Sequence, residues 1–146
     1  MPNKDLMRQW FIKAAERYVG TPYEWGGQNA AGIDCSGMVV ECGRAVGISE
    51  LRDDKSADQI WQTMKDIYPT FDVPGPGFIA CWFRSDGTVY HVAICIDHFM
   101  CVTADGGGST VHTPEDADKK NAFVKYRPVI HRNGVVRFID PFGDKL

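Results

Sequence analysis

The sequence predicts an α+β fold in a single domain that spans residues 1–146. Three observations lead to this prediction. Apolar residues recur at helical spacing through the first half of the chain. A breaker-rich connection with three prolines follows at residues 69–77. Beyond it, short apolar runs between turn signals are typical of strands. Helices that precede an antiparallel sheet indicate the α+β class.

Three helices are expected in the first half of the chain. The first covers residues 6–18 and places Leu6, Trp10 and Ala14 on one face, at i, i+4 and i+8. Gly20 ends it. The other two helices are expected at residues 34–47 and 56–67.

The second half is expected to form strands. The predicted strands are residues 78–83, 89–96, 99–103 and 122–129. Residues 106–108 and 113–120 are expected to form loops or a short helix.

Composition and charge exclude several classes of protein. The 146 residues are 44% hydrophobic and 24% charged, so the chain can bury a core without a disulfide or metal. A net charge of −3 argues against a nucleic-acid binder. No run approaches the ~20 apolar residues of a membrane span, and the N-terminal residues lack the apolar run of a secretory signal. We therefore expect synthesis in the cytoplasm and no membrane insertion.

Five cysteines are the unusual feature of the composition. They are Cys35, Cys42, Cys81, Cys95 and Cys101. An odd number cannot all pair within one chain, and no two form a CxxC, so the spacing supports neither a disulfide framework nor a zinc site. We expect free thiols and no metal or other cofactor.

Cys35 is the cysteine that the pattern separates from the others. It follows Asp34, a good N-cap, and so lies in the first turn of a helix. Unpaired N–H groups and the positive dipole end favour an anion there, which predicts a lowered thiol pKa. The other four cysteines lie on apolar stripes or in strands and are expected to pack in the core. Inert packing is also the more common role for any single cysteine.

A nucleophilic cysteine needs a base, and His91 is the best of the four histidines. It lies inside a predicted strand, on the same face as Ala93 and Cys95. Val92 and Ile94 alternate with it and form the core side. A histidine on a rigid strand next to small side chains can point into a cleft, although a lone strand histidine is more often structural.

Four segments, in order, resemble the NlpC-type family of papain-like cell-wall cysteine peptidases. The pattern is roughly GxPYxWGG, then DCSG at a helix start, a PGD-like entry to the sheet, and an HVGIY-like strand. The matching segments are residues 18–27, 32–38, 74–79 and 91–96. The acidic residue of the third motif is missing. The resemblance spans roughly residues 10–130.

The resemblance implies a papain-like fold, with a nucleophile helix packed on an antiparallel sheet. It also implies hydrolysis of amide bonds in peptidoglycan stem peptides. Cys35 would attack the carbonyl, and His91 would accept and then deliver the proton. The family positions that line the pocket and contact the peptide fall on Tyr23, Asp34 and Ser36. Capping of the helix is an alternative role for Asp34.

The third catalytic residue departs from the family pattern. The family usually has His, Asn or Gln one strand after the catalytic histidine, and counting from His91 places Thr103 there. Asp105, two residues further on, is chemically the better partner for an imidazole, and His112 is a third candidate.

Two other functions remain open at this stage. One is an amidase of the related CHAP type that cuts a different bond in the same polymer. The other is a catalytically silent peptidoglycan-binding or phage-tail structural module with the same fold. Residues 106–108 and 122–128 look similar to phage-encoded relatives. The expected place of action is therefore the bacterial cell wall, reached as part of a phage particle or another large assembly.

Overall fold

The computed structural model describes residues 3–29, 32–105 and 110–146. Helices cluster in the first half and a sheet dominates the second, which confirms the α+β prediction. The helices are α1 (Lys4–Arg17), α2 (Cys35–Val46), α3 (Ala57–Met64) and α4 (Pro114–Lys120), with short 3₁₀ turns η1 (Ser49–Leu51) and η2 (Val129–His131).

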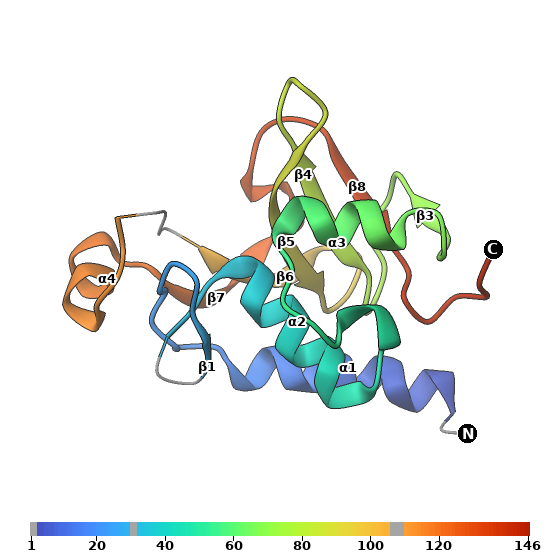
Figure 1. The fold of residues 1–146 in the computed structure, drawn as a ribbon, viewed down its shortest axis with the longest axis horizontal. Coiled ribbons are helices and arrows are strands. Elements are labelled where there is room, and N and C mark those ends of the chain that lie inside the picture. Colours follow the sequence, from blue (N-terminus) through green and yellow to red (C-terminus); the bar gives the residue numbers. More distant parts are fainter. Residues whose placement is uncertain (1–2, 30–31, 106–109) are drawn as a thin grey trace.

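The main sheet is antiparallel, with the strand order β3-β8-β4-β5-β6-β7. Its strands are β3 (Thr70–Phe71), β4 (Ile79–Phe83), β5 (Val89–Cys95), β6 (Met100–Asp105), β7 (Phe123–Pro128) and β8 (Val136–Ile139). A two-stranded ribbon of β1 (Gln28–Asn29) and β2 (Gly32–Ile33) precedes α2. In Figure 1, α1, α2 and α3 lie together beside the sheet, and α4 lies at the opposite end of the molecule from the C-terminus.

Local sequence signals fix the ends of the central helices. Asp34 caps α2 by accepting a hydrogen bond from the Gly37 N–H. Gly47 ends this helix in the left-handed conformation, at φ 81°. Ser56 and Gln59 form a reciprocal capping box at the start of α3.

Strand β5 divides the core into two layers. Val92 and Ile94 pack with α1, α2 and α3 in the main cluster, whereas Ala93 and Cys95 belong to a second cluster on the other face. This alternation follows the period of two in a strand. It confirms the predicted core side of the strand and leaves His91 on the face away from the main cluster.

The predicted buried face of the first helix is wrong. Leu6 and Trp10 are 44% and 47% exposed, whereas Phe11 and Ala15 are completely buried. The helix is rotated so that the Phe11 ring packs edge-on against Phe142, with 5.4 Å between ring centres. The packing of Phe11 on this C-terminal ring determines which face of the helix is buried. Helical spacing within residues 6–18 does not predict a partner so distant in the sequence.

The second half also contains structure that the pattern did not predict. Strand β8 pairs with β3 and β4, and β3 itself lies in the breaker-rich connection. Strand β6 continues to Asp105. Of the two alternatives for residues 113–120, the structure has a short helix capped by Thr113. Residues 106–108 lie outside the described part of the chain. Among the described residues, no helix is long and apolar enough to cross a membrane.

Candidate active site

Cys35 is the first residue of α2, and Asp34 fixes the loop that leads into it. The Asp34 carboxylate accepts hydrogen bonds from the N–H of Gly37 at 2.7 Å and of Gly26 at 2.9 Å. The Ser36 hydroxyl donates to the same carboxylate at 3.3 Å. Asp34 therefore has the capping role, and it ties the glycine-rich loop to the start of the helix.

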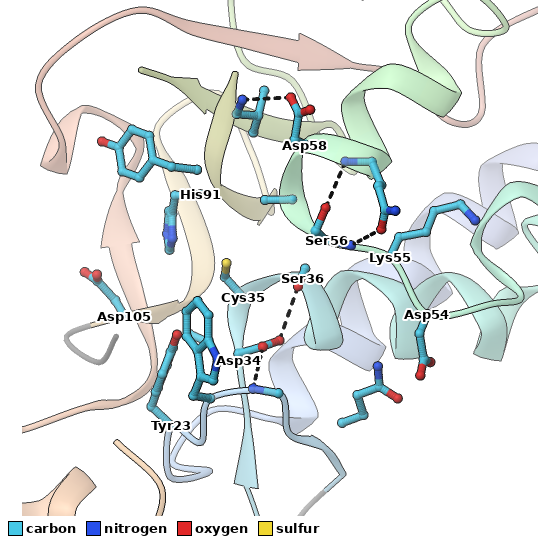
Figure 2. Close-up of a pocket in the computed structure, with 18 of the residues that line it drawn as sticks. Tyr23, Asp34, Cys35, Ser36, Asp54, Lys55, Ser56, Asp58, His91 and Asp105 are labelled. Carbon is cyan, nitrogen blue, oxygen red and sulfur yellow. Dashed lines mark hydrogen bonds between the residues drawn. The ribbon is translucent and has the colours of Figure 1, made fainter. Parts of the chain in front are cut away.

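The Cys35 sulfur lies against the strand that carries His91. The backbone N–H groups of Val92 and Ser36 both donate to it. The residue is partly exposed, but protein surrounds most of the sulfur. Figure 2 shows the sulfur of Cys35 and the ring of His91 pointing into the same cavity. The fold thus brings the two predicted catalytic residues together, from α2 and β5.

Thr103 makes the hydrogen bond to the histidine ring. Its Oγ1 lies 2.7 Å from His91 Nε2, and Thr103 is fully buried behind the ring. The pairing of Cys95 with Cys101 in β5 and β6 sets the register. Continued along the two strands, this register puts Thr103 and Asp105 on the same face as His91.

Asp105 belongs to a charged cluster next to this pair. Its carboxylate accepts from Arg132 Nη2 at 2.5 Å and lies 3.3 Å from Arg127 Nη1 and 3.6 Å from His131 Nε2. A ligand atom from each of His91, Asp105 and His131 falls within 4.8 Å of the others. Three such groups could hold a metal ion, but the two guanidinium groups already neutralise the carboxylate and would repel a further cation.

The protein environment shifts the pKa of both reacting groups. Burial raises the pKa of the Cys35 thiol to about 11, despite the two N–H donors. This reverses the lowering expected from the helix N-terminus, because desolvation of the thiolate outweighs the helix-end effect. Burial, Arg132 and His131 together lower the pKa of His91 to about 3, and Asp105 opposes them. At neutral pH the resting pair is therefore a thiol beside a neutral imidazole.

A cleft of about 800 Å³ opens onto the pair. Its lining includes Tyr23, Asp34, Cys35, Ser36, His91 and Asp105. The fold therefore brings these six predicted residues together. His112 is exposed next to α4 and is not in the lining, so the third candidate for the triad lies elsewhere.

The remaining four cysteines are completely buried in the two core clusters, as expected from their positions on stripes and strands. Cys42 and Cys81 lie in the main cluster, and Cys95 and Cys101 lie in the second. All five cysteines are free thiols.

Some residues of the cleft were not found by sequence reasoning. Arg84, Tyr90 and Arg132 line it as well. Tyr90 directly precedes His91 on a predicted strand, so its place near the active site could have been predicted from the sequence. Arg132 follows η2 in a segment without periodicity, and only the tertiary fold brings it to the site.

Comparison with known proteins gives the family. The NlpC/P60 family matches residues 20–128. The chain is 30% identical over 107 residues to Protein P54 of Enterococcus faecium, and 30% identical over 105 residues to the gamma-D-glutamyl-L-lysine dipeptidyl-peptidase of Bacillus subtilis (strain 168). These matches cover 73% and 71% of this chain, but 18% and 31% of the relatives, so the chain spans less than a third of their length.

Solved structures agree with the fold. The NlpC/P60 domain of the peptidoglycan hydrolase SagA superposes with a TM-score of 0.63 at 22% identity, covering 89% of this chain and 96% of that one. The peptidoglycan hydrolase RipB from Mycobacterium tuberculosis superposes with a TM-score of 0.67 at 22% identity, covering 96% and 67%. The family match covers most of the chain, and the fold agrees with it: this protein belongs to the NlpC/P60 family.

Proposed function

We propose that this protein is a cysteine peptidase that hydrolyses amide bonds in the stem peptides of bacterial peptidoglycan. The observation that carries the proposal is the meeting of Cys35, at the start of α2, with His91 of β5 in one cleft. The relative from Bacillus subtilis is named for cleavage next to a γ-D-glutamyl residue, which supports this substrate class.

The contact between His91 Nε2 and Thr103 Oγ1 supports one assignment of the two ring nitrogens. When Nε2–H donates to Thr103 Oγ1, Nδ1 carries the lone pair and is the nitrogen left to serve Cys35. Thr103 is then the positioning residue for the imidazole. Asp105 supplies negative charge near the ring, since its effect on His91 is to raise the pKa against the desolvation.

The reaction begins from the neutral pair. His91 Nδ1 accepts the thiol proton as the Cys35 sulfur attacks the peptide carbonyl, and a C–S bond forms. The N–H of Cys35 at the helix start is positioned to stabilise the oxyanion. The C–N bond then breaks, and the leaving amine takes the proton from the imidazolium. Water repeats the sequence on the thioester and releases the carboxylic acid and the free thiol.

The glycine-rich loop and the helix start would hold the peptide. Tyr23, Asp34 and Ser36 line the same cleft as Cys35. Asp34 already accepts three hydrogen bonds, so its first role is to keep the loop in place.

The release of new amines from purified peptidoglycan tests the proposal. The wild-type protein is expected to release them, and Cys35→Ala is expected to release none above background. Cys42→Ala is the matched control, because it removes a thiol from the same helix but outside the cleft. Equal release by wild type and Cys35→Ala would contradict the proposal and favour a silent binding module.

We also propose that the protein reaches the cell wall as part of a phage particle or another large assembly. The support for this route is the sequence resemblance of residues 122–128, which contain all of β7, to phage-encoded proteins. Antibody detection of the chain in purified, nuclease-treated particles tests it. Detection only in the free protein fraction would contradict it.

A further inference from the structure

Two arginines flank a tyrosine on one wall of the active-site cleft. Arg84 follows β4, Arg132 follows η2, and Tyr90 lies on β5 directly before His91. The guanidinium carbons lie 5.5 Å and 5.6 Å from the centre of the Tyr90 ring, within the range of cation–π contacts. All three residues line the cleft that contains Cys35.

Contacts on its inner side hold the Arg132 guanidinium in place. Nη2 donates to Asp105 and Nε donates to His131 Nε2 at 3.2 Å. A guanidinium has five N–H donors, so Arg132 can keep both contacts and still donate to a second carboxylate. Arg84 donates from Nη1 to Thr88 Oγ1 at 3.3 Å and is largely exposed.

This end of the cleft holds three arginines and their carboxylate partners. Arg127 and Arg132 share the Asp105 carboxylate, and Arg84 lies near Asp86. The other side of the cavity is less basic. Figure 2 shows Asp34, Asp54 and Lys55 on the side of α2, away from His91 and Asp105.

Arg132 also acts on the reacting atoms. Its charge favours the Cys35 thiolate and disfavours the protonated form of His91. A group bound by Arg132 would therefore lie close to the bond that is cut. Guanidinium N–H groups form shorter and stronger hydrogen bonds to a carboxylate than to a neutral acceptor, so an anionic group of the substrate is the better ligand for Arg84 and Arg132.

We propose that Arg84 and Arg132, on either side of Tyr90 in sequence and both against its ring, bind a carboxylate of the substrate peptide beside the scissile amide. The proposal rests on the peptidase function proposed above. The carboxylate has two possible sources. It can be the α-carboxylate of the γ-linked acyl residue, or a carboxylate of the residue that leaves as the amine.

Matched synthetic peptides test this subsite. One peptide carries both carboxylates, a second has a carboxamide on the acyl residue, and a third has a carboxamide on the leaving residue. Wild type is expected to cleave one carboxamide peptide with a kcat/KM about tenfold lower. The carboxamide peptide with the lowered kcat/KM shows which of the two carboxylates the arginines bind.

The informative variant is Arg84→Gln, because Arg84 does not contact Asp105 in the described contacts and its loss leaves the His91 surroundings in place. It is expected to lower kcat/KM about tenfold for the favoured peptide, mainly through KM, and to leave the carboxamide peptide unchanged. Arg17→Gln, on the exposed end of α1, is the control of equal charge change.

Three results are decisive in different ways. The subsite is supported if wild type discriminates between the carboxylate and carboxamide peptides and Arg84→Gln does not. Cleavage of all three peptides at equal rates, or equal behaviour of Arg84→Gln and Arg17→Gln, overturns it and leaves the peptidase proposal intact. Absence of cleavage of every peptide, and of peptidoglycan, contradicts the peptidase proposal itself.

A separate observation concerns two of the buried thiols. Cys95 and Cys101 are directly opposed in β5 and β6. The Cys95 backbone bonds toward β4, accepting from the Gly77 N–H at 2.8 Å and donating to the Phe78 carbonyl at 2.9 Å. Cys95 and Cys101 therefore form a non-hydrogen-bonded pair, whose Cα atoms approach to about 4.5 Å. That separation lies within the range that a disulfide spans.

We infer that this pair is the disulfide site of the chain. Oxidised glutathione is the oxidant: both thiols lose a proton and an electron to form the S–S bond, and the glutathione disulfide is reduced to two thiols. Both sulfurs are completely buried, so exchange requires the chain to be opening or folding. The bond would join β5 to β6 on the face that carries His91 and Thr103.

Refolding with oxidised glutathione, followed by mass spectrometry without reduction, tests the disulfide. Residues 85–118 contain no Lys or Arg, so cleavage before Asp97 is needed to separate the two cysteines. A loss of two hydrogens, linked peptides containing Cys95 and Cys101, and a Tm higher by about 5 °C are expected. Five free thiols after refolding, or the same Tm gain in Cys95→Ser, would overturn the inference.

Discussion

The active-site cleft combines residues from two kinds of segment. Cys35 and His91 come from regular elements, at the first residue of α2 and within β5. Arg84 and Arg132 come from connecting segments that follow β4 and η2. Periodicity and capping place the first two residues, whereas long-range packing places the two arginines. The positions of the reacting groups could therefore be predicted from local sequence, and the positions of the charged residues around them could not.

The largest effect is expected when the nucleophile, which comes from a regular element, is removed. Cys35→Ala should lower the rate of peptide cleavage by at least about 10³-fold, because no other cysteine lines the cleft. Thermal unfolding of the variant should match that of wild type, since the residue is only partly buried. A variant that keeps the wild-type rate would contradict the assignment of Cys35 as the nucleophile.

The charged residues around His91 make its contribution to stability depend on pH. Burial, Arg132 and His131 lower the pKa of His91 from 6.5 to about 3. Below pH 6.5 the unfolded chain therefore binds a proton that the native state excludes, so the free energy of unfolding falls as pH falls. Between pH 7 and pH 5 the expected loss is about 2 kcal/mol, measured by urea unfolding.

His91→Gln is the control for this pH dependence. It should remove most of the loss between pH 7 and pH 5. If the variant keeps the wild-type slope, another group is responsible. The same low pKa predicts that cleavage does not decline between pH 7 and pH 5 through protonation of His91, as it would for a histidine of ordinary pKa.

Substitution of Thr103 tests whether its hydrogen bond with His91 contributes to catalysis. Thr103→Val keeps the shape but removes the group that contacts His91 Nε2 at 2.7 Å. We expect kcat to fall about tenfold, the value of one buried hydrogen bond, with little change in KM. Thr103→Ser retains the hydroxyl and should recover most of the rate. Equal rates for the Val and Ser variants would make the role of Thr103 purely one of packing.

The smallest expected effect concerns Ser36. Its hydroxyl donates to Asp34 at 3.3 Å, while two backbone N–H groups hold the same carboxylate more closely. Ser36→Ala should therefore leave stability within about 1 kcal/mol and raise KM about threefold, through a lost substrate contact. An unchanged KM would restrict Ser36 to the capping network.

Sequence reasoning was most successful where a short motif fixes a local structure. Asp34 and Gly47 mark the ends of α2, and the alternation along β5 correctly predicts which side chains face the main core. Counting along the strands put Thr103 in the third position, but its chemistry made Asp105 the preferred candidate there; in the structure the Thr103 hydroxyl contacts His91 Nε2. Each of these predictions depends on neighbours within one element or one hairpin.

The remainder depended on partners that are distant in the chain. The rotation of α1 follows from Phe11 packing on Phe142, and β8 completes the sheet from the C-terminal end. The raised pKa of Cys35 reflects how deeply the fold buries the sulfur, which a helix N-terminus alone does not reveal. Arg132 reaches the site only because η2 turns the chain back toward Asp105.

Capture of the acyl-enzyme is the most direct test of the central claim, that Cys35 with His91 hydrolyses peptide bonds of the cell wall. Wild-type protein would be mixed with a soluble stem peptide, quenched with acid within the first turnover, and mapped by mass spectrometry. We predict a thioester on Cys35 that carries the acyl half of the peptide and is absent from Cys35→Ala and present in Cys42→Ala. Release of product amine without any adduct on Cys35, or with an adduct on another residue, would contradict the account.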